Sequence, residues 1–177
     1  MDKGFHKTAM YFFRISIIVI HVLAAFIWLG GMFFIALVAV PTLRKLEPLE
    51  KRIELLSDTA RRFRRISWIA VSVLLITGVI NAINHGVTTE MISTGKIFLS
   101  NFGTILTVKV VLVLIMLVLS AIHDFFLGPK MVDIMSVGVS NPESLQRIKK
   151  YRRFVSWLAR VNVILGILVI TCAVMLS

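Results

Sequence analysis

The chain has 177 residues, 58% of them hydrophobic, and a mean hydropathy of +0.90. A soluble domain is excluded, because the apolar residues form runs long enough to cross a hydrocarbon core of roughly 30 Å. The formal net charge is +11, but the basic residues are concentrated between these runs, which argues against nucleic acid as a partner and for the lipid bilayer.

Four apolar runs predict four membrane-spanning helices. They cover about residues 15–40, 66–83, 102–126 and 154–176, close to the ~17–25 residues that a spanning helix needs. We expect an all-α integral membrane four-helix bundle that forms a single domain over residues 1–177. The two basic loops would then be residues 41–65 and 127–153.

The first run also has features of a signal peptide. Lys3, Lys7 and Arg14 precede it, and Ala24-Ala25 resembles a small-residue cleavage site. Its apolar character continues without a break well past these alanines, beyond the ~7–15 residues of a signal-peptide core. The sequence therefore predicts a retained helix.

The distribution of basic residues predicts the orientation in the membrane. The two long loops contain fourteen of the twenty: Arg44, Lys45, Lys51, Arg52, Arg61, Arg62, Arg64 and Arg65 in one, and Lys130, Arg147, Lys149, Lys150, Arg152 and Arg153 in the other. By the positive-inside rule both loops are cytoplasmic, with both termini and residues 84–101 outside a bacterial-type inner membrane. Pro48 and Pro142 each predict the start of a short surface helix within these loops.

Several landmarks recur at a nearly constant separation. His21 and Lys109 are 88 residues apart, as are Pro41 and Pro129, whereas the Ser-Trp pairs that end at Trp68 and Trp157 are 89 residues apart. This pattern predicts two tandem helical hairpins, in which His21 and Lys109 lie at the same depth.

Ionisable residues inside a membrane are costly, by ~2.5–3.5 kcal/mol on insertion scales, and usually mark function. This favours a functional role for His21, whereas Lys109 has the alternative of extending its ammonium toward the headgroups. Lys109 and His123 are fourteen residues apart, so they project from the same side of one helix. His85 is expected at the outer end of the second helix, beside Asn81 and Asn84.

A second polar cluster is expected near the other membrane boundary. His123 and Asp124 end the third apolar run, and Asp124 is placed to form an ion pair with Arg160. His21 and His123 differ in depth by ~20 Å, so they cannot ligate one metal ion. Cys172 is the only cysteine, which excludes an intramolecular disulfide and a Cys-x-x-Cys motif.

Three segments resemble a known family. Residues 21–32, HVLAAFIWLGGM, resemble the first helix of copper resistance protein D (CopD) domains. Residues 102–112 resemble the lysine-bearing helix of these domains, and residues 121–129 resemble sequence variants found among uncharacterised members of the family. A more distant similarity is to HemJ-type protoporphyrinogen oxidases, which bind haem b. That similarity implicates His21, Trp28 and Lys109. The chain lacks the Arg-Leu-Phe-Val-Tyr-His and Asn-Glu-x-Pro motifs of the second family, so its oxidase activity is not expected here.

The leading hypothesis is a b-type haem held by His21, with Lys109 as the second axial ligand or as a propionate partner. Such a protein would pass electrons from a quinol to an acceptor outside, as a membrane oxidoreductase or electron carrier. Copper transport or copper resistance is the alternative, with His85 and His123 as lesser candidate ligands. A third hypothesis is an interaction subunit without a cofactor, and a homodimer is left open.

Overall fold

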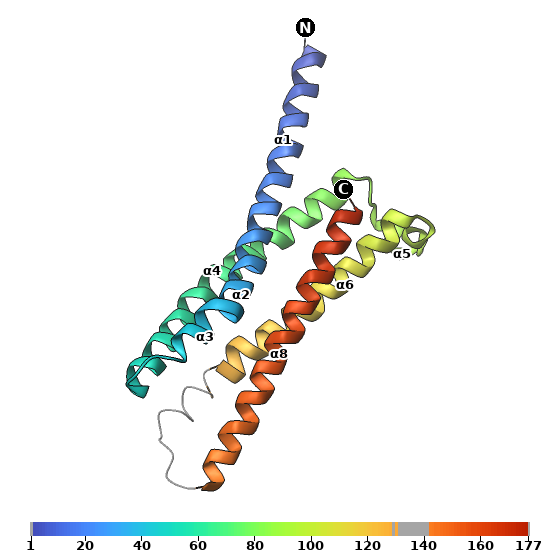
Figure 1. Cartoon of the computed structure of the whole chain (residues 1–177). Helices are drawn as coiled ribbons and strands as arrows, with labels where there is room; N and C mark the ends of the chain where they lie inside the picture. Colours follow the sequence, from blue (N-terminus) through green and yellow to red (C-terminus); the bar gives the residue numbers. More distant parts are fainter. Residues whose placement is uncertain (1, 129, 131–141, 177) are drawn as a thin grey trace. The chain divides into compact units, whose positions relative to one another are not determined.

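The computed structural model describes residues 2–128, 130 and 142–176, and within these residues the chain is almost entirely helical, with no strand (Figure 1). Four of its helices are long and apolar enough to cross a membrane: His6–Leu43, Lys51–Asn84, Asn101–Leu127 and Arg153–Met175. The predicted all-α, multi-pass membrane fold is confirmed.

The first spanning helix is continuous but not uniformly α-helical. It consists of α1 (Asp2–Ala25), η1 (Phe26–Gly30), α2 (Gly31–Phe34), η2 (Ile35–Ala39) and α3 (Val40–Leu43), and both η segments are π-helical. At the end of η2 the Val40 N–H donates to the Ile35 carbonyl, five residues back. Pro41 explains this widening, because its ring would meet the Leu37 carbonyl in an ordinary α-helix.

The third spanning helix has the same feature at its end. It comprises α6 (Asn101–Ala121) and the π-helical η4 (Ile122–Leu127), after which the Gly128 N–H donates to the His123 carbonyl. Pro129 follows directly in the sequence. The ends of η2 and η4, at Ala39 and Leu127, are therefore 88 residues apart, which supports the predicted repeat.

The second and fourth spanning helices extend further than their apolar runs. They are α4 (Leu49–Asn84) and α8 (Pro142–Met175). Much of the predicted loop 41–65 is thus helical, because its sequence is rich in helix formers and contains an i,i+4 ion pair in which Arg62 Nε lies 2.8 Å from Asp58 Oδ2. The helix starts predicted from Pro48 and Pro142 are confirmed, although neither helix is short.

The chain divides into two compact units, and each is described by itself. The first contains Met1–Gly31 and Arg65–Thr104, and the second contains Met32–Arg64 and Ile105–Ser177. The first unit includes the end of α4, the short helices α5 (Thr89–Ser93) and η3 (Lys96–Leu99), and the first turn of α6. The second unit includes most of α6, η4 and α8.

The connection before α6 is tightly built. Ser100 caps α6, since its Oγ accepts a hydrogen bond from the Gly103 N–H at 3.0 Å. Gly103 also lies directly against η3, where a Cβ at this position would overlap the Ile97 carbonyl oxygen. A glycine at residue 103 therefore lets η3 fold back onto the start of α6.

Candidate functional site

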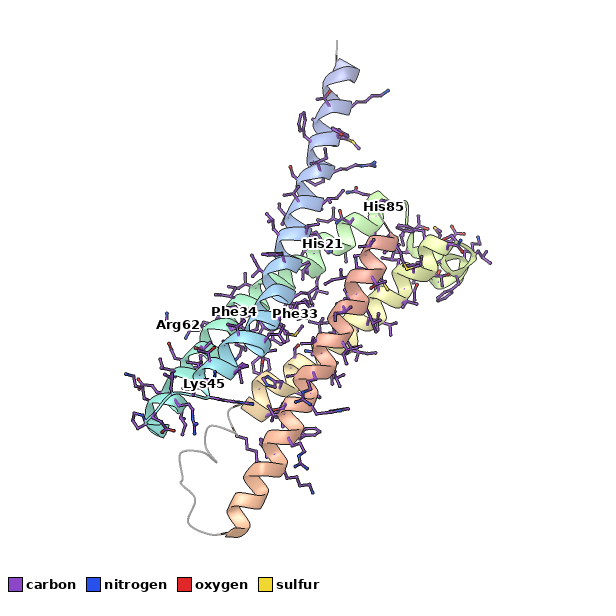
Figure 2. All side chains as sticks on the ribbon, in the orientation of Figure 1. His21, Phe33, Phe34, Lys45, Arg62 and His85 are labelled. Atoms are coloured by element: carbon purple, nitrogen blue, oxygen red, sulfur yellow. The ribbon has the colours of Figure 1, made fainter. Side chains whose placement is uncertain are left out.

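His21 is held by a side chain of another helix. It lies on α1 (Figure 2) and is half-buried. Its Nδ1 is 2.7 Å from Thr77 Oγ1 on α4. Both residues belong to the first unit. Thr77 is buried, with 5% exposure, so the hydrogen bond joins two spanning helices inside the apolar segment.

The partners of Thr77 define which nitrogen of His21 carries the proton. Thr77 Oγ1 lies 2.6 Å from the Val73 carbonyl oxygen, one turn earlier on α4. A carbonyl only accepts, so the single hydroxyl hydrogen is donated to Val73, and the hydroxyl oxygen accepts from His21 Nδ1–H. The neutral ring then carries its lone pair on Nε2. A histidine fixed in this way through Nδ1 is the usual arrangement of a metal-ligating imidazole.

Buried apolar residues follow His21 at helical spacing on the first spanning helix. Ala24 and Trp28 follow the histidine by three and seven residues and are 5% and 3% exposed. Gly78 faces the ring from α4, since a Cβ there would lie 3.4 Å from His21 Cε1. The backbone of α4 therefore comes close to the imidazole.

His21 could serve as an axial ligand of haem iron or as one ligand of a metal ion bound by the protein. Haem iron needs only one or two axial side chains, because the macrocycle supplies the other ligands. No group of three or more His, Cys, Asp or Glu suited to a metal ion occurs within residues 2–128, 130 and 142–176.

The other predicted ligands are distributed over both units. Lys109 is half-buried on α6 in the second unit, so its pairing with His21 stays a prediction. His85 is exposed just beyond α4, with its ring centroid 5.2 Å from that of Phe102 (Figure 2). The exposure of His85 agrees with the expected position at the membrane boundary.

For the polar cluster predicted at the other boundary, the structure gives one contact between consecutive residues. His123 Nδ1 lies 3.1 Å from Asp124 Oδ1, within η4. Arg160 is exposed on α8, and its ion pair with Asp124 stays a prediction.

Sequence reasoning missed a second polar contact between helices. Asn162 Nδ2 on α8 donates to Ser120 Oγ on α6 at 2.8 Å, and Asn162 is 7% exposed. Asn162 Oδ1 is buried and has no hydrogen-bond partner in the part of the chain that the structure describes. The available signal was Asn162 itself, an amide in the middle of the fourth apolar run.

A model of the family described as copper resistance protein D matches residues 57–176. The chain belongs to the copper resistance protein D family. The matched segment contains Thr77, Lys109, His123 and Asn162, and it begins after the helix that carries His21.

Similarity to a curated protein extends over nearly the whole chain. An uncharacterized protein from Aquifex aeolicus (strain VF5) is 28% identical over 162 residues, which are 91% of this chain and 93% of that protein. No solved structure matches.

Proposed function

We propose that this CopD-family protein binds haem b inside the membrane and transfers electrons, with His21 Nε2 as an axial ligand. The observation that supports this function is the chain of hydrogen bonds from His21 through Thr77 to the Val73 carbonyl. It orients the imidazole and leaves the lone pair on Nε2, which is the state that iron requires.

Bound haem would supply a reversible one-electron centre, and the protein would tune it. Thr77 holds the imidazole plane and raises the basicity of Nε2, because Nδ1–H donates a hydrogen bond. Ala24 and Trp28 keep the surroundings apolar, which is one of the factors that set a haem potential. The repeat makes Lys109 the proposed second ligand or propionate partner.

The first experiment is absorption spectroscopy of the protein purified from haem-replete cells. We expect a Soret band in the wild type and its loss, or at least a tenfold decrease in haem content, in His21→Ala. His85→Ala is the matched control, because that histidine is exposed outside the apolar segment, and its spectrum should equal that of the wild type. A wild-type protein without a Soret band would exclude the proposal.

The same spectra test Lys109. Lys109→Met should retain haem through His21 but change the axial coordination, seen as a shift of the Soret band or of the ferric charge-transfer bands. An unchanged spectrum with an unchanged haem content would remove Lys109 from the coordination sphere.

Copper binding is the second candidate, because the family is described as copper resistance protein D. Metal analysis of the same sample separates the two functions. Stoichiometric copper without haem, lost in His21→Ala, would favour a copper site; haem without copper would favour the first proposal.

A further inference from the structure

The Ser120–Asn162 pair leaves a polar atom unsatisfied deep in the apolar segment. Asn162 uses its Nδ2 on Ser120, while its buried Oδ1 has no partner among the described residues. If the Asn162 amide is rotated by 180°, the atom without a partner is the amide nitrogen instead of the oxygen. One polar atom therefore stays unpaired in either orientation. Such an atom costs free energy unless a further group binds to it.

The position of this pair lies within the membrane-spanning part of both helices. Ser120 lies seven residues before the end of its apolar helix at Leu127, and Asn162 lies nine residues after the start of its own at Arg153. At 1.5 Å per residue these positions are ~10 and ~14 Å from the end of the span that carries the basic connections. A ligand that reaches them through the bilayer must be largely apolar and carry a hydrogen-bonding group.

A second acceptor lies about one turn away. His123 follows Ser120 by three residues, so both are on the same side of this helix. His123 Nδ1 lies 3.1 Å from Asp124 Oδ1, and since a carboxylate only accepts, the proton is on Nδ1 and the neutral ring has its lone pair on Nε2. Asn162 Oδ1 and His123 Nε2 are thus two acceptors, contributed by α8 and by η4.

We propose that Asn162 and His123 form a binding site for the head group of a membrane quinol. A quinol has an apolar body and hydroxyl donors on opposite sides of its ring, and its oxidised form offers carbonyl acceptors at the same positions. Binding requires only the second unit. Its role as electron donor to the protein rests on the proposed haem function.

The binding test uses the full-length protein in lipid nanodiscs and a short-chain azidoquinone. Photolabelling should modify peptides from η4 and from the middle of α8, and excess unlabelled quinol should suppress it. The affinity should fall by about tenfold or more in Asn162→Leu, the loss expected for a buried hydrogen bond. His123→Ala is a second variant at the boundary of the membrane, where the effect on folding is smaller, and it should also weaken binding.

Two controls make the result specific. Thr171→Val removes a hydroxyl from the same helix, but that hydroxyl donates only to the Ile167 carbonyl of its own helix and is exposed, so binding should change less than twofold. Ser72→Ala should also bind quinone like the wild type, because the Ser72 hydroxyl is exposed and donates to the Trp68 carbonyl of its own helix. Unaltered affinity in both Asn162→Leu and His123→Ala, or labelling confined to other segments, would overturn the proposed site.

Reduction kinetics then link the site to haem. Dithionite should reduce the haem of the wild type and of Asn162→Leu at equal rates, whereas a short-chain quinol should reduce the variant at least tenfold more slowly. Quinol binding without haem would refute the proposed function and leave the quinol site standing. Haem without quinol binding would do the reverse.

Discussion

Thr77 is the residue on which the orientation of His21 depends. Its hydroxyl both accepts from Nδ1–H and donates to the Val73 carbonyl, so removal of this one oxygen frees the imidazole to rotate and to exchange tautomers. Hydrogen bonds of this kind behind a metal ligand are typically worth 10–100-fold in affinity.

Thr77→Val should therefore weaken haem binding by about 10–100-fold while it preserves the shape of the side chain. Haem titration of the apoprotein measures this change. Ser72→Ala is the matched control on the same helix, because the Ser72 hydroxyl donates only to the Trp68 carbonyl and is exposed. Equal affinity in Thr77→Val and wild type would show that His21 does not need this partner.

Single residues differ in how far the sequence could reveal them. His21 was predictable, because an ionisable group within a long apolar run is costly and seldom incidental. Its contact with Thr77 was not, because periodicity assigns a residue to a helix face but not to a partner 56 residues away. The contact of Ser120 was not predictable either, because an isolated hydroxyl can donate its hydrogen bond to a carbonyl of its own helix.

At the scale of secondary-structure elements, the return of η3 onto α6 depends on Gly103. A side chain at residue 103 would overlap the Ile97 carbonyl oxygen, which is backbone and cannot move without a shift of η3. The loop therefore requires a glycine for reasons of space rather than of dihedral angle.

Gly103→Ala should lower stability by about 1–3 kcal/mol, the usual cost of overpacking. Thermal unfolding in detergent, followed by circular dichroism, checks this decrease. Gly30→Ala is the matched control, since a Cβ at that helical position meets nothing within 4 Å, and it should leave the transition unchanged or slightly raised. Equal transitions for the two variants would contradict the steric argument.

The lengths of the elements were only partly predictable. Hydropathy located the four spanning helices, because apolar runs of this length have few other structures available. Hydropathy underestimated the length of α4, because the charged first half of this helix is stabilised by local helix propensity and ion pairs rather than by burial. The π-helical segments were not foreseen, although prolines follow η2 and η4 and explain these two.

At the scale of the whole molecule, the placement of charge predicts how the chain crosses the membrane. The connection of α3 with α4 and the polar half of α4 carry eight basic residues, whereas residues 84–101 carry only Lys96. Lys3, Lys7 and Arg14 oppose this bias but are fewer.

Cysteine labelling in intact bacterial cells tests the predicted orientation. In a Cys172→Ser background, Glu90→Cys should react with a membrane-impermeant maleimide from outside, and Lys45→Cys should react only after permeabilisation. Both positions are exposed, so accessibility does not bias the comparison. The opposite labelling pattern would reverse the orientation.

The cross-helix hydrogen bonds also have a consequence for membrane assembly. Apolar helices in lipid have little preference for one register, because the lipid tails are as apolar as the side chains. A slip of one turn, about 5.4 Å, in either pair of helices would leave the His21 Nδ1–H or the Asn162 amide without its partner on the neighbouring helix. Each of the two hydrogen bonds, His21–Thr77 and Ser120–Asn162, thus favours one register of its pair of helices. This selection acts before any cofactor or ligand is present.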